Sequence, residues 1–346
     1  MNPNCELRIA NCELKMSRWT EEQVIQAIQK IFPPREDLAP CGIGDDCAVL
    51  KPGLELITTD ASVEGVHFDL SWMSLADAAY RCMTSNVSDA AAMGAYAGPF
   101  TLALGLRGEL EFNEILSAIQ AIRDCIQEHG LSDCWLIGGD VVRSPQVFFS
   151  ITILSQKSAW PVVLRSGTKP GDVILALGRL GMSAVGLELF RRGFDKKCSS
   201  QSAYAPYLKA FCRPHALTNL GPDIARQQLV HAMMDISDGI RTDLPRLMKQ
   251  SHCGARVDLG GLVPDGDLVQ ICKEINIDPI DQMLCGGEDF GLLLTTSPQN
   301  VAKIQKYACT HQVPCYEIGV CTDSKNVEWF ERGELSQRVD ASFSHF

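Results

Sequence analysis

The chain has 346 residues, of which 46% are hydrophobic and 21% charged, so it is long enough for two globular domains with separate cores. A formal net charge of −11 argues against nucleic acid or an anionic membrane surface as a partner. No apolar run reaches the roughly 18 residues that a membrane-spanning helix needs. The excess of acidic side chains fits either a solvated surface or an enzyme that binds divalent cations.

The first predicted element is an amphipathic helix over residues 20–32, which opens on the capping box TEEQ and ends before Pro33-Pro34. Ser74 is expected to cap a long helix over residues 75–93, whose many alanines permit close packing. The other elements expected in this half are a helix over 112–129 and strands over 47–50, 54–59, 101–106, 136–137 and 147–154.

A turn-rich segment, SGTKPGD, spans residues 166–172 and has the composition of a linker or the start of a domain. The elements expected after it are strands over 173–177, 232–235, 256–259 and 290–295, helices near 202–212 and 214–228, and helix starts at 178–181 and 238. This alternation predicts a mixed α/β (α+β) protein with domains at 18–158 and 159–346.

The cysteine pattern and the first residues of the chain indicate the cellular compartment in which the protein is expected. The 15 cysteines are an odd number, and no pair has the C-x-x-C spacing of zinc or redox sites. Because many stand among apolar residues, we expect a reduced, cytoplasmic protein. Residues 1–17 repeat NCELRIA as NCELKMS without the layout of a signal peptide, so we expect a disordered extension there.

Acidic residues recur where predicted apolar strands end or glycine turns close. They are Asp45, Asp46, Asp60, Asp89, Asp140, Asp235, Asp238, Glu288 and Asp289. Taken singly, each is typical of turn chemistry or of a helix N-cap. Most of them have no adjacent lysine or arginine, and clustered carboxylates without cationic partners favour a metal site.

The absence of histidine and cysteine from these clusters predicts Mg²⁺ or Mn²⁺ as the metal, because all-oxygen ligands do not suit Zn²⁺. Mg²⁺ usually binds through one or two carboxylates and substrate phosphates, so several ions imply a substrate rich in phosphate oxygens. Phosphoryl transfer is the chemistry that such a site supports. The chain contains neither a G-x-x-x-x-G-K-[ST] loop nor the HRD and DFG motifs, so we expect a fold unlike P-loop enzymes and protein kinases.

Seven sequence blocks between Trp19 and the C-terminus resemble the thiamine-monophosphate kinases in their order. They are GIGDDCAVL, TTDASVEGVHF, NVSDAAAMGA, GGDVVRSP, SGTKPGD, DISDGIRTDL and GGEDF. This family belongs to a superfamily that includes aminoimidazole-ribonucleotide synthetase and selenophosphate synthetase. The resemblance implies a homodimer in which the sheet of an N-terminal domain forms a barrel with its partner, followed by a C-terminal α/β domain.

The resemblance also implies an activity. ATP, as co-substrate, would phosphorylate thiamine monophosphate directly and in line, with several Mg²⁺ ions and no phosphoenzyme, in the last step of thiamine diphosphate synthesis. The metal ligands implied are Asp46, Thr58, Thr59, Asp60, Asp89, Asp140, Asp235 and Asp238. The nucleotide contacts implied are Gly139, Asp140, Arg165 and Ser237, and the substrate contacts are His67, Glu288 and Phe343. Catalysis is assigned to Asp46, Asp235 and Arg165, the last as the cation that stabilises phosphate charge.

The chain departs from the family pattern at two blocks. Val141-Val142 replace hydroxyl side chains in GGDVVR, so any polar contact there is lost. Phe290-Gly291 replace tyrosine and glutamate in GGEDFG, while Glu288 and Asp289 are kept. Taken alone, His67 is typical of a core or surface histidine, and Arg165 of a solvated arginine beside a linker.

Two other functions stay open. One is another ATP-using member of the superfamily: a selenophosphate synthetase would need a reactive cysteine, and Cys41 has no lysine beside it to activate it. A hydrogenase-maturation relative would need a C-terminal cysteine, whereas this chain ends in Phe346. The other is a non-catalytic nucleotide or thiamine-phosphate binding protein, which has no chemical need for so many unpaired carboxylates.

Overall fold

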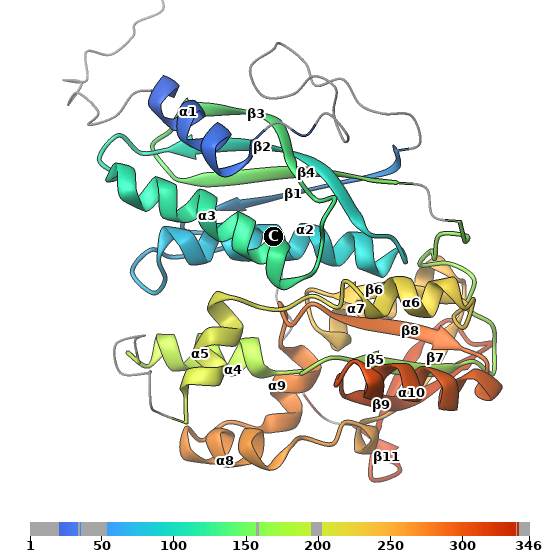
Figure 1. Ribbon diagram of the computed structural model, residues 1–346. Coiled ribbons are helices and arrows are strands. Elements are labelled where there is room, and N and C mark those ends of the chain that lie inside the picture. Colours follow the sequence, from blue (N-terminus) through green and yellow to red (C-terminus); the bar gives the residue numbers. More distant parts are fainter. Residues whose placement is uncertain are drawn as a thin grey trace, which may run out of the picture.

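The computed structural model describes residues 21–33, 35, 54–156, 159–194, 203–336 and 338. Two β-sheets organise them, a four-stranded sheet in the first half of the chain and a seven-stranded sheet in the second, drawn above and below in Figure 1. The predicted strand over 47–50 and the predicted extension over 1–17 lie outside the described residues.

The first sheet has the strand order β1-β4-β2-β3, in which only the β2–β3 pair is parallel. Its strands are β1 (Leu54–Val63), β2 (Ala97–Leu106), β3 (Leu136–Arg143) and β4 (Phe148–Gln156). Helices α2 (Leu75–Ala92) and α3 (Phe112–Glu128) lie on the side of this sheet that faces the second half of the chain (Figure 1). Helix α1 (Glu21–Ile31) packs against α3 and β3.

Helix α2 begins at a local sequence signal and is buried along most of its length. The Ser74 hydroxyl accepts the backbone N–H of Asp77 at 3.2 Å, and the Asp77 carboxylate accepts the N–H of Ser74 at 3.1 Å. The helix contacts β1 and β4 on one side and β6, α5 and α6 on the other. Helix α2 therefore lies between the two sheets. Its partly exposed residues Ser85 and Asp89 line the cleft between the two halves of the chain.

The second sheet has the strand order β11-β10-β7-β9-β5-β8-β6. Its strands are β5 (Val173–Leu177), β6 (Ala232–Ile236), β7 (Gly254–Asp258), β8 (Gly291–Thr296), β9 (Cys315–Thr322), β10 (Val327–Glu331) and β11 (Glu334–Leu335). Its α-helices are α4 (Met182–Arg191), α5 (Ala205–Cys212), α6 (Leu220–Arg226), α7 (Ile240–Gln250), α8 (Gly266–Glu274), α9 (Pro279–Cys285) and α10 (Val301–Thr310), and short 3₁₀ turns are η2 (Leu259–Gly261) and η3 (Pro298–Asn300).

Both faces of the central strands are covered, so strand β5 is apolar and buried at every position. Helices α6 and α10 pack on the face that carries Leu175 and Leu292. Helices α4, α7, α8 and α9 share the core that contains Ile174 and Leu293 on the opposite face. Because β5 and β6 are antiparallel to β8, they end at the edge of the sheet where β8 begins.

Among the predicted elements whose bounds differ from the observed ones, three show the effect of a packing partner. Strand β1 continues past Asp60 to Val63, because β4 pairs with it over this whole length. Strand β3 runs through Gly139 and Asp140 to Arg143, paired with β2, so Asp140 lies inside a strand and not beyond its end. Helix α6 begins at Leu220 instead of residue 214, because the segment before it is bound to the end of α3. The predicted division between residues 158 and 159 stays a prediction.

Candidate active site

A cleft of about 1020 Å³ separates the two halves of the molecule, and its walls come from both. It collects many of the residues singled out in the sequence. Those that line it are Asp60, His67, Asp89, Arg165, Asp235, Ser237, Asp238 and Glu288.

Three carboxylates from three different elements meet across this cleft. Asp60 comes from β1, Asp89 from the last turns of α2, and Asp235 from the end of β6. Burial, and then the negative charge of Asp60, raise the pKa of Asp89. Burial, and then the negative charge of Asp89, raise the pKa of Asp235 to about 7. Asp89 therefore repels both Asp60 and Asp235, and the Arg165 guanidinium offsets this repulsion at Asp89 and Asp235.

Helix α2 and strand β1 hold these carboxylates in place through neutral side chains. The Thr58 hydroxyl donates a hydrogen bond to Asp89 at 2.6 Å. The Ser88 hydroxyl donates to Asp235 at 3.0 Å. The resulting donor set is all oxygen, which fits a hard divalent cation. Within the described ranges, no three His, Cys, Asp or Glu side chains form a ready-made metal group.

The loop between α9 and β8 carries two residues in left-handed backbone conformation that are not glycine. Glu288 has φ of 64° and Phe290 has φ of 49°. The N–H of Glu288 donates to the carbonyl of Ser237 at 2.8 Å, and the N–H of Phe290 donates to the carbonyl of Ile236 at 3.1 Å. These two hydrogen bonds hold the loop against the end of β6. Conformations of this kind cost free energy and are concentrated at functional sites.

The Glu288 side chain is held by a buried cation that the sequence did not reveal. Arg81, in α2, is 6% exposed and pairs with the Glu288 carboxylate and the carbonyl of Phe211. The one local signal was an arginine within a helix rich in alanine and apolar side chains. Such a charge needs a partner when the helix is buried on both sides.

Helix α7 and the loop before it share a second set of ion pairs that the sequence did not reveal. Asp243, fully buried, accepts the N–H groups of Ser237 at 3.1 Å and Asp238 at 3.0 Å. Arg246 pairs with both Asp238 and Asp243. The prediction that the carboxylates lack cationic partners is therefore wrong for Asp238 and for Glu288, which pairs with Arg81.

His67 lies half-buried in the cleft wall, and its Nδ1 accepts the N–H of Val63 at 3.1 Å. In the neutral ring this contact leaves the hydrogen on Nε2. Thr59 alternates to the opposite side of β1 from Thr58 and donates its hydroxyl to the carbonyl of Ile151 at 3.0 Å.

Some predicted site residues stand apart from the cleft. Gly139 and Asp140 are exposed on β3, and strands β2 and β4 separate β3 from β1. Neither lines the cleft that contains Asp60 and Asp235. Asp46 and Phe343 lie outside the described residues.

The sheet topology and the acidic cleft between the halves define an AIR synthase related protein. The N-terminal domain of that class matches residues 44–156, and its C-terminal domain matches residues 169–330. The thiamine-monophosphate kinase of Escherichia coli K12 is 35% identical over 312 residues, which cover 88% of this chain and 91% of the relative. The chain belongs to the thiamine-monophosphate kinase family, and the resemblance found in the sequence is confirmed.

Solved structures agree with this assignment. A thiamine-monophosphate kinase from Stenotrophomonas maltophilia K279a has a TM-score of 0.78 and 28% identity, covering 93% of this chain and 98% of that one. The AaThiL structure complexed with AMPPCP and TMP has a TM-score of 0.72 and 25% identity, covering 94% of this chain and 97% of that one. The predicted two-domain fold is therefore confirmed, while the predicted barrel between subunits stays a prediction.

Proposed function

We propose that this protein transfers the γ-phosphoryl group of ATP to thiamine monophosphate, which gives thiamine diphosphate and ADP. The observation that carries the proposal is the cleft in which Asp60, Asp89 and Asp235 face Arg165, in a chain of this family. The relative whose structure holds AMPPCP and TMP supports a site that takes a nucleotide together with a second ligand. The reaction joins two anions, so its main requirement is neutralisation and alignment of phosphate charge.

The three facing carboxylates are proposed to hold Mg²⁺ together with Thr58 and the nucleotide phosphates. Bound Mg²⁺ would offset the negative charge of both reactants. The repulsion of Asp89 with Asp60 and with Asp235, and the hydroxyl groups that donate to Asp89 and Asp235, support this assignment. Asp46 and Asp238 are proposed as further ligands, whereas Thr59, on the opposite side of β1, and Asp140, on β3, lie apart from this group.

The remaining polar groups of the cleft divide between the two substrates. Arg165 is exposed and, among the described residues, forms no ion pair, so its guanidinium is available for the transferring phosphoryl group. Ser237 is proposed to contact the nucleotide, whereas Gly139 and Asp140 lie apart from this cleft. His67 and Glu288 line the cleft and are proposed to contact thiamine monophosphate, with Phe343. A carboxylate such as Glu288 complements the positive charge of the thiamine ring system.

A homodimer is supported by the uncovered face of the first sheet. Within the described residues, helices α2 and α3 cover only one face, and Ile57 is 71% exposed and Val142 40% exposed. Such apolar positions on an open sheet favour contact with a second copy. Sedimentation of Val142→Asp should show a monomer where the unchanged protein is a dimer, and equal sedimentation would contradict the proposal.

The proposed location is the cytoplasm. The ten cysteines within the described ranges are all free, as expected of a reducing compartment. No helix in the same ranges is both long enough and apolar enough to cross a membrane.

The direct test is to incubate the purified protein with ATP, Mg²⁺ and thiamine monophosphate and to measure thiamine diphosphate and ADP. Equal amounts of both products are expected, and the products should disappear with Asp46→Asn. The matched control is Asp323→Asn, the same change at an exposed turn outside the cleft. Bound nucleotide without thiamine diphosphate would contradict the proposed function.

A further inference from the structure

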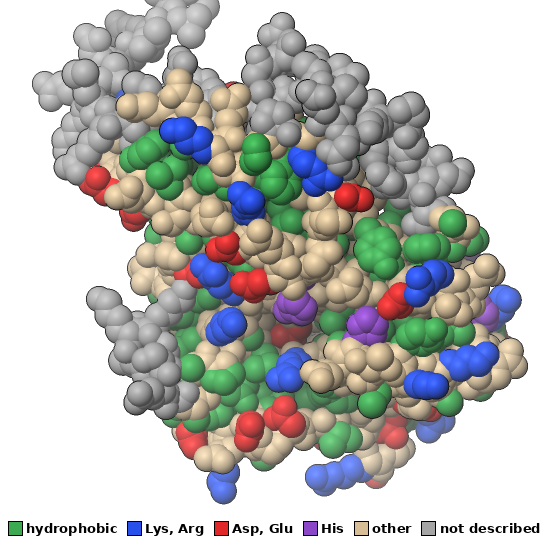
Figure 2. All heavy atoms as spheres, viewed as in Figure 1, with side chains coloured by type: hydrophobic (Ala, Val, Ile, Leu, Met, Phe, Trp, Pro, Cys, Tyr) green, Lys and Arg blue, Asp and Glu red, His purple; other side chains and the backbone are tan. Residues whose placement is uncertain are grey.

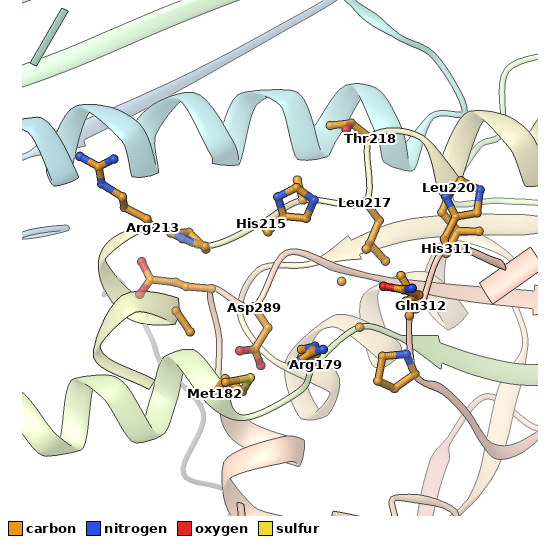
Figure 3. A pocket seen from close by; sticks show the side chains of 18 of the residues that line it. Arg179, Met182, Arg213, His215, Leu217, Thr218, Leu220, Asp289, His311 and Gln312 are labelled. Atoms are coloured by element: carbon orange, nitrogen blue, oxygen red, sulfur yellow. The ribbon is translucent and has the colours of Figure 1, made fainter. Parts of the chain in front are cut away.

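A second cleft, of about 420 Å³, lies on the other side of the loop that carries Glu288. Its walls are formed by the turn after β5, the start of α4, helix α5, the segments 213–220 and 311–314, and the loop before β8. Figure 3 shows Arg179 and Met182 projecting from below and His215 and Leu217 from the segment above. None of the residues predicted for ATP, Mg²⁺ or thiamine monophosphate lines it except Glu288.

Two positively charged side chains of this cleft have no ion-pair partner among the described residues. Arg179 and Lys209 line it, are exposed, and form no ion pair with any residue in the described part of the chain. On the face shown in Figure 2, histidine, lysine and arginine side chains lie near the level where the two halves meet. The chain as a whole carries a formal net charge of −11, so an uncompensated basic cleft is unexpected on composition alone.

The acidic residues of the cleft do not neutralise these two cations. Glu288 is paired with Arg81. The Asp289 carboxylate accepts the N–H of Gly181 at 2.6 Å and that of Ser183 at 3.0 Å, so both of its oxygens are bonded at the start of α4. Neither carboxylate forms an ion pair with Arg179 or Lys209. Two cationic side chains that line one cleft suit a phosphate group.

Part of the remaining lining is apolar. Met182, Pro206, Pro214, Leu217 and Pro314 contribute side chains with little or no polar surface. Proline rings and a leucine side chain give a surface against which a planar ring can pack with little loss of entropy. A ligand that combines a phosphate with an aromatic or heterocyclic ring satisfies both parts of the cleft.

One loop, which carries Glu288 and Asp289, forms part of the wall of both clefts. Glu288 lines both clefts, and Asp289, beside it, lines only the second. The left-handed conformations of Glu288 and Phe290 mean that the loop is held in this shape by its surroundings, not by local preference. An occupant that displaces Asp289 from α4 would therefore move Glu288 in the active cleft.

From these observations we propose that the second cleft is an effector site for a small phosphorylated ring compound, with Arg179 and Lys209 as its phosphate-binding residues. Its occupancy changes the position of Glu288 and therefore the binding of thiamine monophosphate. The effect on thiamine monophosphate rests on the proposed function, whereas the binding site itself does not.

Pyridoxal 5′-phosphate is a suitable probe because it carries a phosphate, a planar ring and an aldehyde. Its aldehyde condenses with the Lys209 amine to form an imine and water, and borohydride reduces the imine to a stable secondary amine. Mass spectrometry then compares the labelling of Lys209 with that of Lys273, an exposed lysine outside the cleft. We expect Lys209 to react first, and equal labelling of both lysines would overturn the site.

A variant and its control test the phosphate contact independently of catalysis. Arg179→Gln should reduce labelling of Lys209 by about tenfold, as expected for the loss of one charged hydrogen-bonding partner. Arg256→Gln, at an exposed arginine of β7 outside the cleft, should leave it unchanged. Competition by ADP but not by inorganic phosphate would show that the ring is needed, and protection by neither compound would overturn the proposed ligand class.

The connection to the active cleft is tested by kinetics with pyridoxine 5′-phosphate, which lacks the aldehyde. It should change KM for thiamine monophosphate in the unchanged protein and not in the Arg179→Gln Lys209→Gln variant. An identical change in both proteins would place the compound in the active cleft and overturn the effector role. Labelling of Lys209 needs no turnover, so an inactive enzyme would contradict the proposed function without affecting the site.

Discussion

His129 ties the two halves of the molecule together as a neutral ring. It is the C-cap residue of α3 and is 1% exposed. Its Nδ1–H donates to the carbonyl of Cys125 at 2.7 Å, and its Nε2 accepts the N–H of Ala216 at 3.0 Å. A second proton on the ring would lie on Nε2 and point at the N–H of Ala216. Two donors cannot form a hydrogen bond, so protonation breaks the contact to Ala216.

The size of this effect follows from the pKa of His129. Burial, and then the neighbouring His215, lower the pKa of His129 from 6.5 to about 4. The unfolded chain therefore binds this proton more tightly than the folded protein does. The free energy of unfolding is then lost as pH falls from 6.5 towards 4, in total by about 3 kcal/mol.

Urea unfolding at neutral pH and at about pH 4.5, followed by tryptophan fluorescence, checks this prediction. The variant His129→Gln offers an amide oxygen to Ala216 and does not titrate, while the other titrating groups remain in both proteins. Between these two pH values, we expect the free energy of unfolding to fall by about 2.5 kcal/mol more in the unchanged protein than in the variant. The control His252→Asn, at an exposed position, should lose as much unfolding free energy over this range as the unchanged protein does. Equal losses in the unchanged protein and His129→Gln would refute the reasoning.

Three further changes test the site and the packing. Asp89→Asn should lower kcat about a hundredfold or more, with an unchanged circular dichroism spectrum. Normal ADP release by this variant would remove Asp89 from the proposed metal site. Arg81→Leu leaves Glu288 without its buried partner and should cost about 3 kcal/mol in urea unfolding, and an unchanged midpoint would contradict a stabilising pair. A Cβ at Gly186 would lie 2.2 Å from a carbonyl of α5, so Gly186→Ala should cost about 2 kcal/mol. Gly266→Ala, with no atom within 4 Å of the new Cβ, should change stability by less than about 0.5 kcal/mol, and equal effects of the two would contradict the packing argument.

Elements with local start and stop signals could be predicted from the sequence. Ser74 and Asp77 fix the beginning of α2 by hydrogen bonds within one turn, and the helix begins at Leu75 after the Ser74 cap, as predicted. Strand β5 was predicted with the observed bounds, because a short apolar run follows a Pro-Gly turn. In both cases the deciding interactions lie within a few residues of each other.

Elements decided by a neighbouring strand could not be predicted in this way. Gly138-Gly139 is typical of a turn, yet β3 continues through it because β2 pairs with it on one side. A Cβ at Gly139 would lie 2.0 Å from the carbonyl of Leu102, so the glycine serves the close approach of two strands. The sequence contains the glycine but not the strand beside it.

The arginines that pair with acidic residues of the site could not be predicted from the sequence either. Arg81 and Glu288 are 207 residues apart in the sequence, and no local pattern connects them. The aspartates were visible because each stands beside a glycine or an apolar run. The cations that hold or balance them come from other elements, so they appear only once α2, α7 and the loop before β8 are packed together.

Helix α2 has a consequence for how the chain can be divided. Its side chains Tyr80, Met83 and Val87 belong to one continuous core that also contains Phe211 and Ile236 of the second half. Cutting the chain between its two sheets would leave this apolar surface in water and the second half without one of its walls. The protein should therefore melt as a single cooperative unit, and neither half should be exchangeable with that of a distant relative unless α2 is exchanged with its partners.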